Sequence, residues 1–176
     1  EDIALHGAGR EDIDARMLGQ GRPFVIEVKK PKKRFIDLPR LAKIINERAN
    51  GKVKVSNLRF ANKDSVRRMK KTEAAQKVYR AIVEFDKPIS DEELAQLEQK
   101  LNNSVVRQQT PRRVLHRRAD LVREKHIYAA KVKRLTPNRI ELKLECQGGL
   151  YIKELINGDD GRTTPSVADT VGTRAV

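Results

Sequence analysis

Between residues 140 and 146 the sequence alternates strictly between apolar and charged side chains. Ile140, Leu142, Leu144 and Cys146 occupy every second position of this run, with charged residues between them. Because successive side chains of a β-strand point to opposite faces, the pattern predicts a strand with one buried and one solvated face. Such strands are typical of antiparallel sheets covered on one side, so the chain is constrained toward a sheet-based fold.

The rest of the chain predicts further strands and several helices. Strands are expected over 24–29, 53–60, 77–85, 105–109 and 120–134. One helix is expected between Asp37 and Asn50-Gly51, and a second begins at the capping box of Ser90 and Glu93 and continues through Leu101. Two shorter helices are expected over 151–157 and after Thr163. Residues 63–74 are predicted to form a basic helix or loop. We therefore expect an α/β (α+β) domain with a mostly antiparallel central sheet, flanking helices and a basic cleft across the sheet.

Positive charge is concentrated in three blocks. The chain has 38 Lys and Arg against 24 Asp and Glu, which gives a net charge of +14 and a pI of about 10.1. Residues 29–34 carry +5, residues 63–71 carry +4 and residues 107–134 carry +8, whereas residues 84–98 carry −5. A single charged run is usually a solvated face, but three together favour nucleic acid as the partner. An anionic membrane is less favoured, because the runs lack an amphipathic helix with large apolar anchors.

Several classes of protein are excluded by simple counts. No apolar run approaches the roughly 20 residues that cross a bilayer, and no signal peptide precedes the first motif. Cys146 is the single cysteine, so neither an internal disulfide nor a cysteine-rich zinc site is expected, and we predict no metal. We expect a monomer in a reducing compartment, the cytoplasm or, in a eukaryote, the nucleus.

The densest cluster of ionisable residues lies between glycines near the start of the chain. It runs Gly9-Arg10-Glu11-Asp12-Ile13-Asp14-Ala15-Arg16-Met17-Leu18-Gly19 and is followed by Gly21-Arg22-Pro23-Phe24. On composition alone this is a surface loop of ion pairs worth about 0–1 kcal/mol each. The run also resembles the signature of the archaeal and eukaryotic tRNA pseudouridine synthases that modify T-arm uridines, the "Pus ten" family, and the GRTD loop of TruA-type synthases. That resemblance places the catalytic aspartate at Asp12 and makes Asp14 a structural partner of Arg16 or Arg22.

Four further segments resemble the same family. Residues 77–83 look like the strand whose tyrosine packs against the target base, and 149–155 are similar to the GTYIR motif of TruB-type enzymes, with Leu150 in place of the threonine. By that likeness Lys153 would pair with Asp12 and favour its ionised form. The segments 110–118 and 158–163 also fit the family pattern. The resemblance implies substrate-binding roles for Arg10, Tyr79, Lys153, Tyr151, Arg113, His116 and Arg117.

The family resemblance implies the pseudouridine synthase fold and an isomerase of tRNA T-arm uridines, at positions 54 and/or 55, that needs no cofactor. Residues 1–176 would be a fragment of the catalytic domain, because the family's N-terminal RNA-binding accessory region has no counterpart in them. Two other classes stay open from the residues alone. One is a non-catalytic RNA-binding module of tRNA or ribosome maturation. The other is a nuclease with Mg²⁺ on Glu11, Asp12 and Asp14. Likewise, Tyr79 alone could be a core aromatic residue and Lys153 a solvated helix residue.

Overall fold

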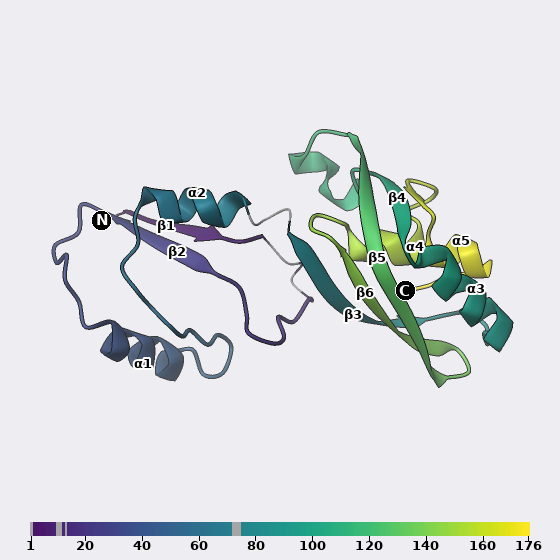
Figure 1. Cartoon of the computed structure of the whole chain (residues 1–176), viewed down its shortest axis with the longest axis horizontal. Coiled ribbons are helices and arrows are strands. Elements are labelled where there is room, and N and C mark those ends of the chain that lie inside the picture. The colour runs from purple at the N-terminus through teal and green to yellow at the C-terminus, as the bar shows by residue number, and fades with distance from the viewer. Residues whose placement is uncertain (1, 10–11, 13, 72–74) are drawn as a thin grey trace. The chain divides into compact units, whose positions relative to one another are not determined.

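The computed structural model describes residues 2–9, 12, 14–71 and 75–176 of the chain. It divides into two compact units, Glu1–Glu73 and Ala74–Val176 (Figure 1). Each unit has its own sheet and its own helices.

The first unit is built on a two-stranded antiparallel ribbon. Strand β1 (Asp2–Gly7) pairs with β2 (Phe24–Lys29) over the full length of both strands. Helix α2 (Lys63–Lys71) contacts both strands and buries Met69. Strand β2 was predicted, and of the helix or loop expected over 63–74 the structure has the helix. Strand β1 was not predicted, although Ile3 and Leu5 alternate with neighbours as a strand requires.

Helix α1 (Leu38–Arg48) begins where its sequence predicts. The Asp37 side chain accepts a hydrogen bond from Arg40 N at 3.0 Å, which satisfies one of the free amides of the first turn. The strand predicted over 53–60 is wrong, because the side-chain amide of Asn46 takes the place of a partner strand. Asn46 Nδ2 donates to Val55 O at 2.9 Å, and Val55 N donates to Asn46 Oδ1 at 2.7 Å.

The second unit contains a five-stranded sheet in which every pairing is antiparallel. Its strands are β3 (Gln76–Glu84), β4 (Ser104–Gln109), β5 (Val122–Thr136), β6 (Arg139–Gln147) and β7 (Thr163–Thr164). Their order across the sheet is β3-β6-β5-β4-β7. The predicted mixed fold with a mostly antiparallel sheet is thus confirmed, and the alternating run of residues 140–146 lies on the strand between β3 and β5.

One face of this sheet forms the core. Ile140, Leu142, Leu144 and Cys146 are all 0% exposed, as the alternation predicts. Helices α3 (Asp91–Leu101), α4 (Ile152–Asn157) and α5 (Val167–Val171) contribute to the same buried cluster. The predicted capping box starts α3, since Ser90 and Glu93 exchange backbone-to-side-chain hydrogen bonds of 3.1 and 2.8 Å.

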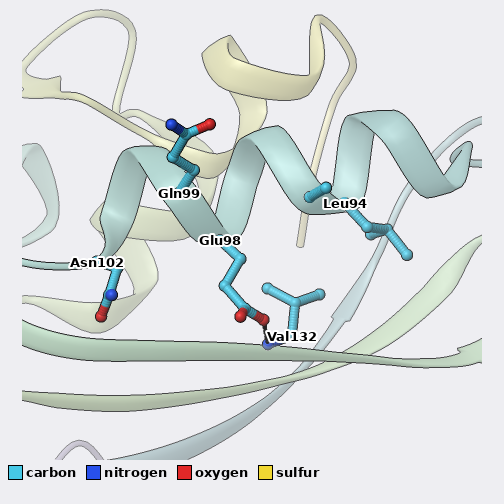
Figure 2. Close-up of a pocket in the computed structure, with 6 residues that line it drawn as sticks. Leu94, Glu98, Gln99, Asn102 and Val132 are labelled. Carbon is cyan, nitrogen blue, oxygen red and sulfur yellow. Dashed lines mark hydrogen bonds between the residues drawn. The ribbon is translucent and has the colours of Figure 1, made fainter.

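Helix α3 also completes the hydrogen bonding of β5 where that strand extends past β4. The pairing with β4 ends at Ile127, and from there side chains of α3 and its C-cap take over. Val132 N donates to Glu98 Oε2 at 2.7 Å (Figure 2). Ala130 N donates to Asn102 Oδ1 at 3.1 Å. The pocket between α3 and β5 is lined by Leu94, Ala95, Glu98, Gln99, Asn102 and Val132, none of which is a predicted site residue.

Candidate active site

The segment with the predicted catalytic aspartate follows β1 in the first unit. Asp12 is half-buried, and its carbonyl accepts a hydrogen bond from Ala15 N at 3.0 Å, which closes a turn. Asp14 is exposed. Arg10, predicted to contact the flipped nucleotide, lies outside the described residues, as does Glu11 of the alternative Mg²⁺ site.

Arg22 fixes the start of this segment. Its Nη1 donates to Ala8 O at 3.3 Å, and Ala8 N donates to Pro23 O at 3.1 Å, so the two ends of the loop are held together. Gly9 has a φ of +96°, and a Cβ built there would lie 2.6 Å from Arg22 Nη1. The backbone conformation at the entrance to the aspartate loop therefore favours a glycine, and a side chain there would also have to displace the Arg22 guanidinium.

Two predicted substrate-binding residues meet in the second unit. The guanidinium carbon of Arg113 lies 5.9 Å from the ring centroid of Tyr151, within the range of a cation–π contact. Arg113 also forms a forked ion pair with Glu154, with Nε–Oε1 at 2.6 Å and Nη2–Oε2 at 3.3 Å. The Glu154 side chain is only 4% exposed, so this pair is buried at its acidic end. Two planar hydrogen bonds of this kind fix the orientation of the guanidinium.

The two late segments that fit the family pattern lie against each other. Arg162 Nη2 donates to Thr110 O at 2.8 Å, and Arg112 N donates to Asp159 Oδ2 at 3.1 Å. Arg112 and Asp160 form an ion pair at 2.5 Å. These contacts hold the 110–118 segment, which includes the 3-10 helix η2 (Arg112–Arg117), beside the loop that precedes β7.

The other predicted residues of the second unit occupy different surroundings. His116 and Arg117 are exposed on η2, and Lys153 is exposed on α4. Tyr79 lies opposite Leu144 in the β3–β6 pairing and packs against the core cluster. Asp12 belongs to the first unit, so its pairing with Lys153 stays a prediction.

The sequence interpretation missed two polar side chains at this site. Glu154 lies inside the motif that carries Tyr151 and Lys153, and a carboxylate within such a motif was the available signal. Gln108 is 3% exposed on β4 and bonds to the backbone of Tyr151. No sequence signal marks it, because a glutamine in a strand is expected to face solvent.

Metal-ligand clusters and membrane spans were sought throughout the described part of the chain. Residues 2–9, 12, 14–71 and 75–176 contain no group of three or more His, Cys, Asp or Glu side chains that could hold a metal ion. Within the same residues, no helix is long and apolar enough to cross a membrane. Cys146 is a buried free thiol, and burial raises its pKa to about 11 although the nearby Lys125 ammonium acts in the opposite sense.

The chain is similar to one family along its whole length. The family model described as "Pus10, C-terminal" matches residues 1–176. The tRNA pseudouridine synthase Pus10 of Methanocaldococcus jannaschii is 52% identical over 176 residues, which cover 99% of this chain and 38% of that protein. The proteins of the same name from Korarchaeum cryptofilum and Thermofilum pendens are 48% and 47% identical, covering 99% and 98% of this chain and 47% and 39% of theirs. The chain thus spans less than half the length of these curated relatives.

A solved structure shares the fold. A chain of the crystal structure of a Cbf5-Nop10-Gar1 complex superposes with a TM-score of 0.52 at 18% sequence identity. The match covers 65% of this chain and 32% of the other. At that identity the likeness concerns the architecture of the sheet and helices alone.

Proposed function

The chain belongs to the Pus10 family, and from this membership we propose that it forms the part of a tRNA pseudouridine synthase that carries the catalytic aspartate, Asp12. The observation that carries the proposal is the match to the C-terminal family model over all 176 residues, together with identities of 47 to 52% to three curated synthases. The substrate we propose is a uridine in the T-arm of tRNA. Residues 1–176 would then be one part of the catalytic domain.

The proposed reaction explains why a carboxylate and a cation are needed. Conversion of uridine to pseudouridine breaks the bond from the ribose to the base nitrogen and forms a bond from the ribose to C5. The C5 hydrogen leaves as a proton and the freed nitrogen gains one, so the reaction is an isomerisation that needs no redox partner. In this proposal the Asp12 carboxylate acts on the sugar or the base, and the Lys153 ammonium is its cationic partner.

The remaining predicted residues would bind the nucleotide. The target uridine has to leave its stack, which costs a few kcal/mol and is offset by stacking and by contacts to its pairing edge. Tyr79 and Tyr151 would supply aromatic rings, and Arg10 would hold the flipped nucleotide or its phosphate. The exposed His116 and Arg117 on η2 are supported as phosphate contacts by their place within the block of charge +8.

A pair of aspartate variants tests the proposed function. We expect Asp12→Ala, in the natural full-length protein, to abolish tritium release from tRNA labelled at uridine C5, with the Kd for tRNA unchanged within about twofold. The matched control is Asp14→Ala, two residues away, which should retain activity. Tritium release by Asp12→Ala at the wild-type rate would refute the catalytic role.

The same assay separates the alternatives. Wild-type protein that binds tRNA but releases no tritium would indicate a non-catalytic RNA-binding module. RNA cleavage that stops when Mg²⁺ is chelated would indicate a nuclease instead. Neither result is expected.

A further inference from the structure

Gln108 is a buried polar residue at a position where the strand pattern calls for an apolar one. It lies on the same face of β4 as Val106, which is 0% exposed, and is itself only 3% exposed. Burying an amide without partners costs several kcal/mol, so its hydrogen bonds decide whether the residue is tolerated there. Its side-chain hydrogen bonds lead to Tyr151 and Thr163, in two of the segments described above.

The side-chain amide of Gln108 is bonded to both backbone groups of Tyr151. Tyr151 N donates to Gln108 Oε1 at 2.8 Å, and Gln108 Nε2 donates to Tyr151 O at 3.0 Å. The second Nε2 hydrogen is directed to Thr163 Oγ1 at 3.1 Å, and Thr163 is itself fully buried. A primary amide offers a donor and an acceptor side by side, so it can pair with a peptide backbone as a neighbouring strand would.

The ring of Tyr151 is oriented independently of its backbone. Arg113 lies over the ring, and the forked ion pair with Glu154 holds the Arg113 guanidinium. Glu154 is three residues along the chain from Tyr151 and is 3% exposed. Tyr151 is therefore held at its backbone by β4 and at its ring by a side chain that α4 fixes.

Tyr151 is also the N-cap of α4, and its side chain makes no capping hydrogen bond. Its carbonyl accepts from Leu155 N at 3.0 Å, which begins the helix, as well as from Gln108. The direction in which α4 starts, and with it the position of Lys153 in the first turn, is thus tied to the Gln108 amide. A displacement of about 1 Å at such a point is enough to slow an enzyme by two orders of magnitude.

We propose that Gln108 is a positioning residue of the synthase, which acts by fixing Tyr151 and the start of α4 so that Tyr151 and Lys153 meet the substrate in a productive geometry. This inference rests on the proposed function. It predicts a defect in the chemical step and not in tRNA affinity, because Gln108 is buried and does not itself touch RNA.

The test uses Gln108→Met and Thr163→Val in the natural full-length protein. Gln108→Met keeps the length of the side chain and removes both bonds to Tyr151. Thr163→Val also removes a buried hydrogen bond of Gln108, but it leaves the bonds between Gln108 and Tyr151 in place. Both variants should lower the midpoint of thermal unfolding, but only Gln108→Met should displace Tyr151. The pair therefore distinguishes an effect of lower stability from an effect of Tyr151 position.

We expect Gln108→Met to slow single-turnover pseudouridine formation at least tenfold, with the Kd for tRNA within twofold of wild type. Thr163→Val should keep a rate within twofold of wild type at a temperature where both variants are folded. Equal rates for the two variants would overturn the inference.

A second variant covers the case in which Gln108→Met does not fold. Gln108→Asn keeps an amide in the strand, but it is one methylene too short to reach both Tyr151 groups. Its rate should also fall by at least tenfold, and a wild-type rate would again overturn the inference. If the wild-type protein forms no pseudouridine, the proposed function fails. If the wild type is active and both Gln108 variants match it, the positioning role alone fails.

Discussion

The two units of the chain differ most in how much apolar surface they bury. In the second unit, strands β3 to β6 and helices α3 to α5 share one buried cluster, in which the inward-facing β6 side chains Ile140, Leu142, Leu144 and Cys146 are 0% exposed. In the first unit, the buried apolar side chains among the described residues are Ala8, Val55 and Met69. One unit is stabilised by a core and the other by local contacts.

The ribbon of the first unit shows this difference clearly. Residues directly opposite each other in an antiparallel pair lie on the same face, so Ile3 and Val28, and Leu5 and Ile26, form one apolar surface. These four side chains are between 43% and 70% exposed. Burial of apolar area stabilises the folded state by about 25 cal/mol per Å². Because these side chains stay largely exposed, this face of the ribbon contributes little such stabilisation. The unit with the predicted catalytic aspartate therefore depends on caps, on the Asn46–Val55 bonds and on the Arg22 contact.

The largest expected effect is a core truncation in the second unit. Leu144→Ala should lower the free energy of unfolding by about 2–5 kcal/mol, because it leaves a cavity in the core where the Leu144 side chain of β6 packs. Urea denaturation followed by circular dichroism measures this loss. A loss below about 1 kcal/mol would show that the cluster is not the source of the unit's stability.

The next effect is the pH dependence that Cys146 contributes. Its pKa in the folded chain is about 11, above the ordinary value of 9.0, because burial disfavours the thiolate. Between these values the unfolded chain loses the thiol proton while the folded chain keeps it, so stability should fall as pH rises from about 9 to 11. The free energy of unfolding of wild type, measured relative to that of Cys146→Val, which removes the titrating group, should therefore fall over that range. A constant difference between the two would contradict the prediction.

Strands β3 to β6 and helices α3 to α5 of the second unit could be predicted because each has a local pattern, whereas the two-residue strand β7 and the 3-10 helix η2 were not predicted. The alternation at 140–146 and the Ser90–Glu93 box are confirmed by β6 and by the start of α3. The strand predicted over 53–60 is wrong because the side-chain amide of Asn46, nine residues earlier, bonds to the backbone of Val55. Alternation alone does not show whether a partner strand exists.

The candidate site was predictable in part for a similar reason. Tyr151, Lys153 and Arg113 lie in motifs, and the structure brings Arg113 to the Tyr151 ring. Glu154 and Gln108 act through tertiary hydrogen bonds that span 41 and 43 residues of sequence, and no short-range pattern encodes such pairings. Asp12 and its pairing with Lys153 stay predictions.

A matched pair of helix caps sharpens the comparison at a smaller scale. Asp37→Ala and Ser90→Ala each remove one N-cap hydrogen bond and should each cost about 1 kcal/mol. Helix α3 should persist, because Leu97 and Leu101 are fully buried, and the lost stability should appear as a lower midpoint of global unfolding. In α1, which buries no residue, the loss should appear as faster amide hydrogen exchange in that helix alone. The same response in both helices would remove the distinction between the units.

The smallest expected effect comes from truncating the exposed face of the ribbon. Leu5 is 70% exposed, so Leu5→Ala should change the free energy of unfolding by no more than about 0.5 kcal/mol. Val25 is half-buried on the paired strand, so Val25→Ala should lower the free energy of unfolding more than Leu5→Ala does. A cost for Leu5→Ala close to that of Leu144→Ala would mean that the face is buried in the natural protein. The first unit would then owe its stability to apolar packing as well, and the contrast with the second unit would be lost.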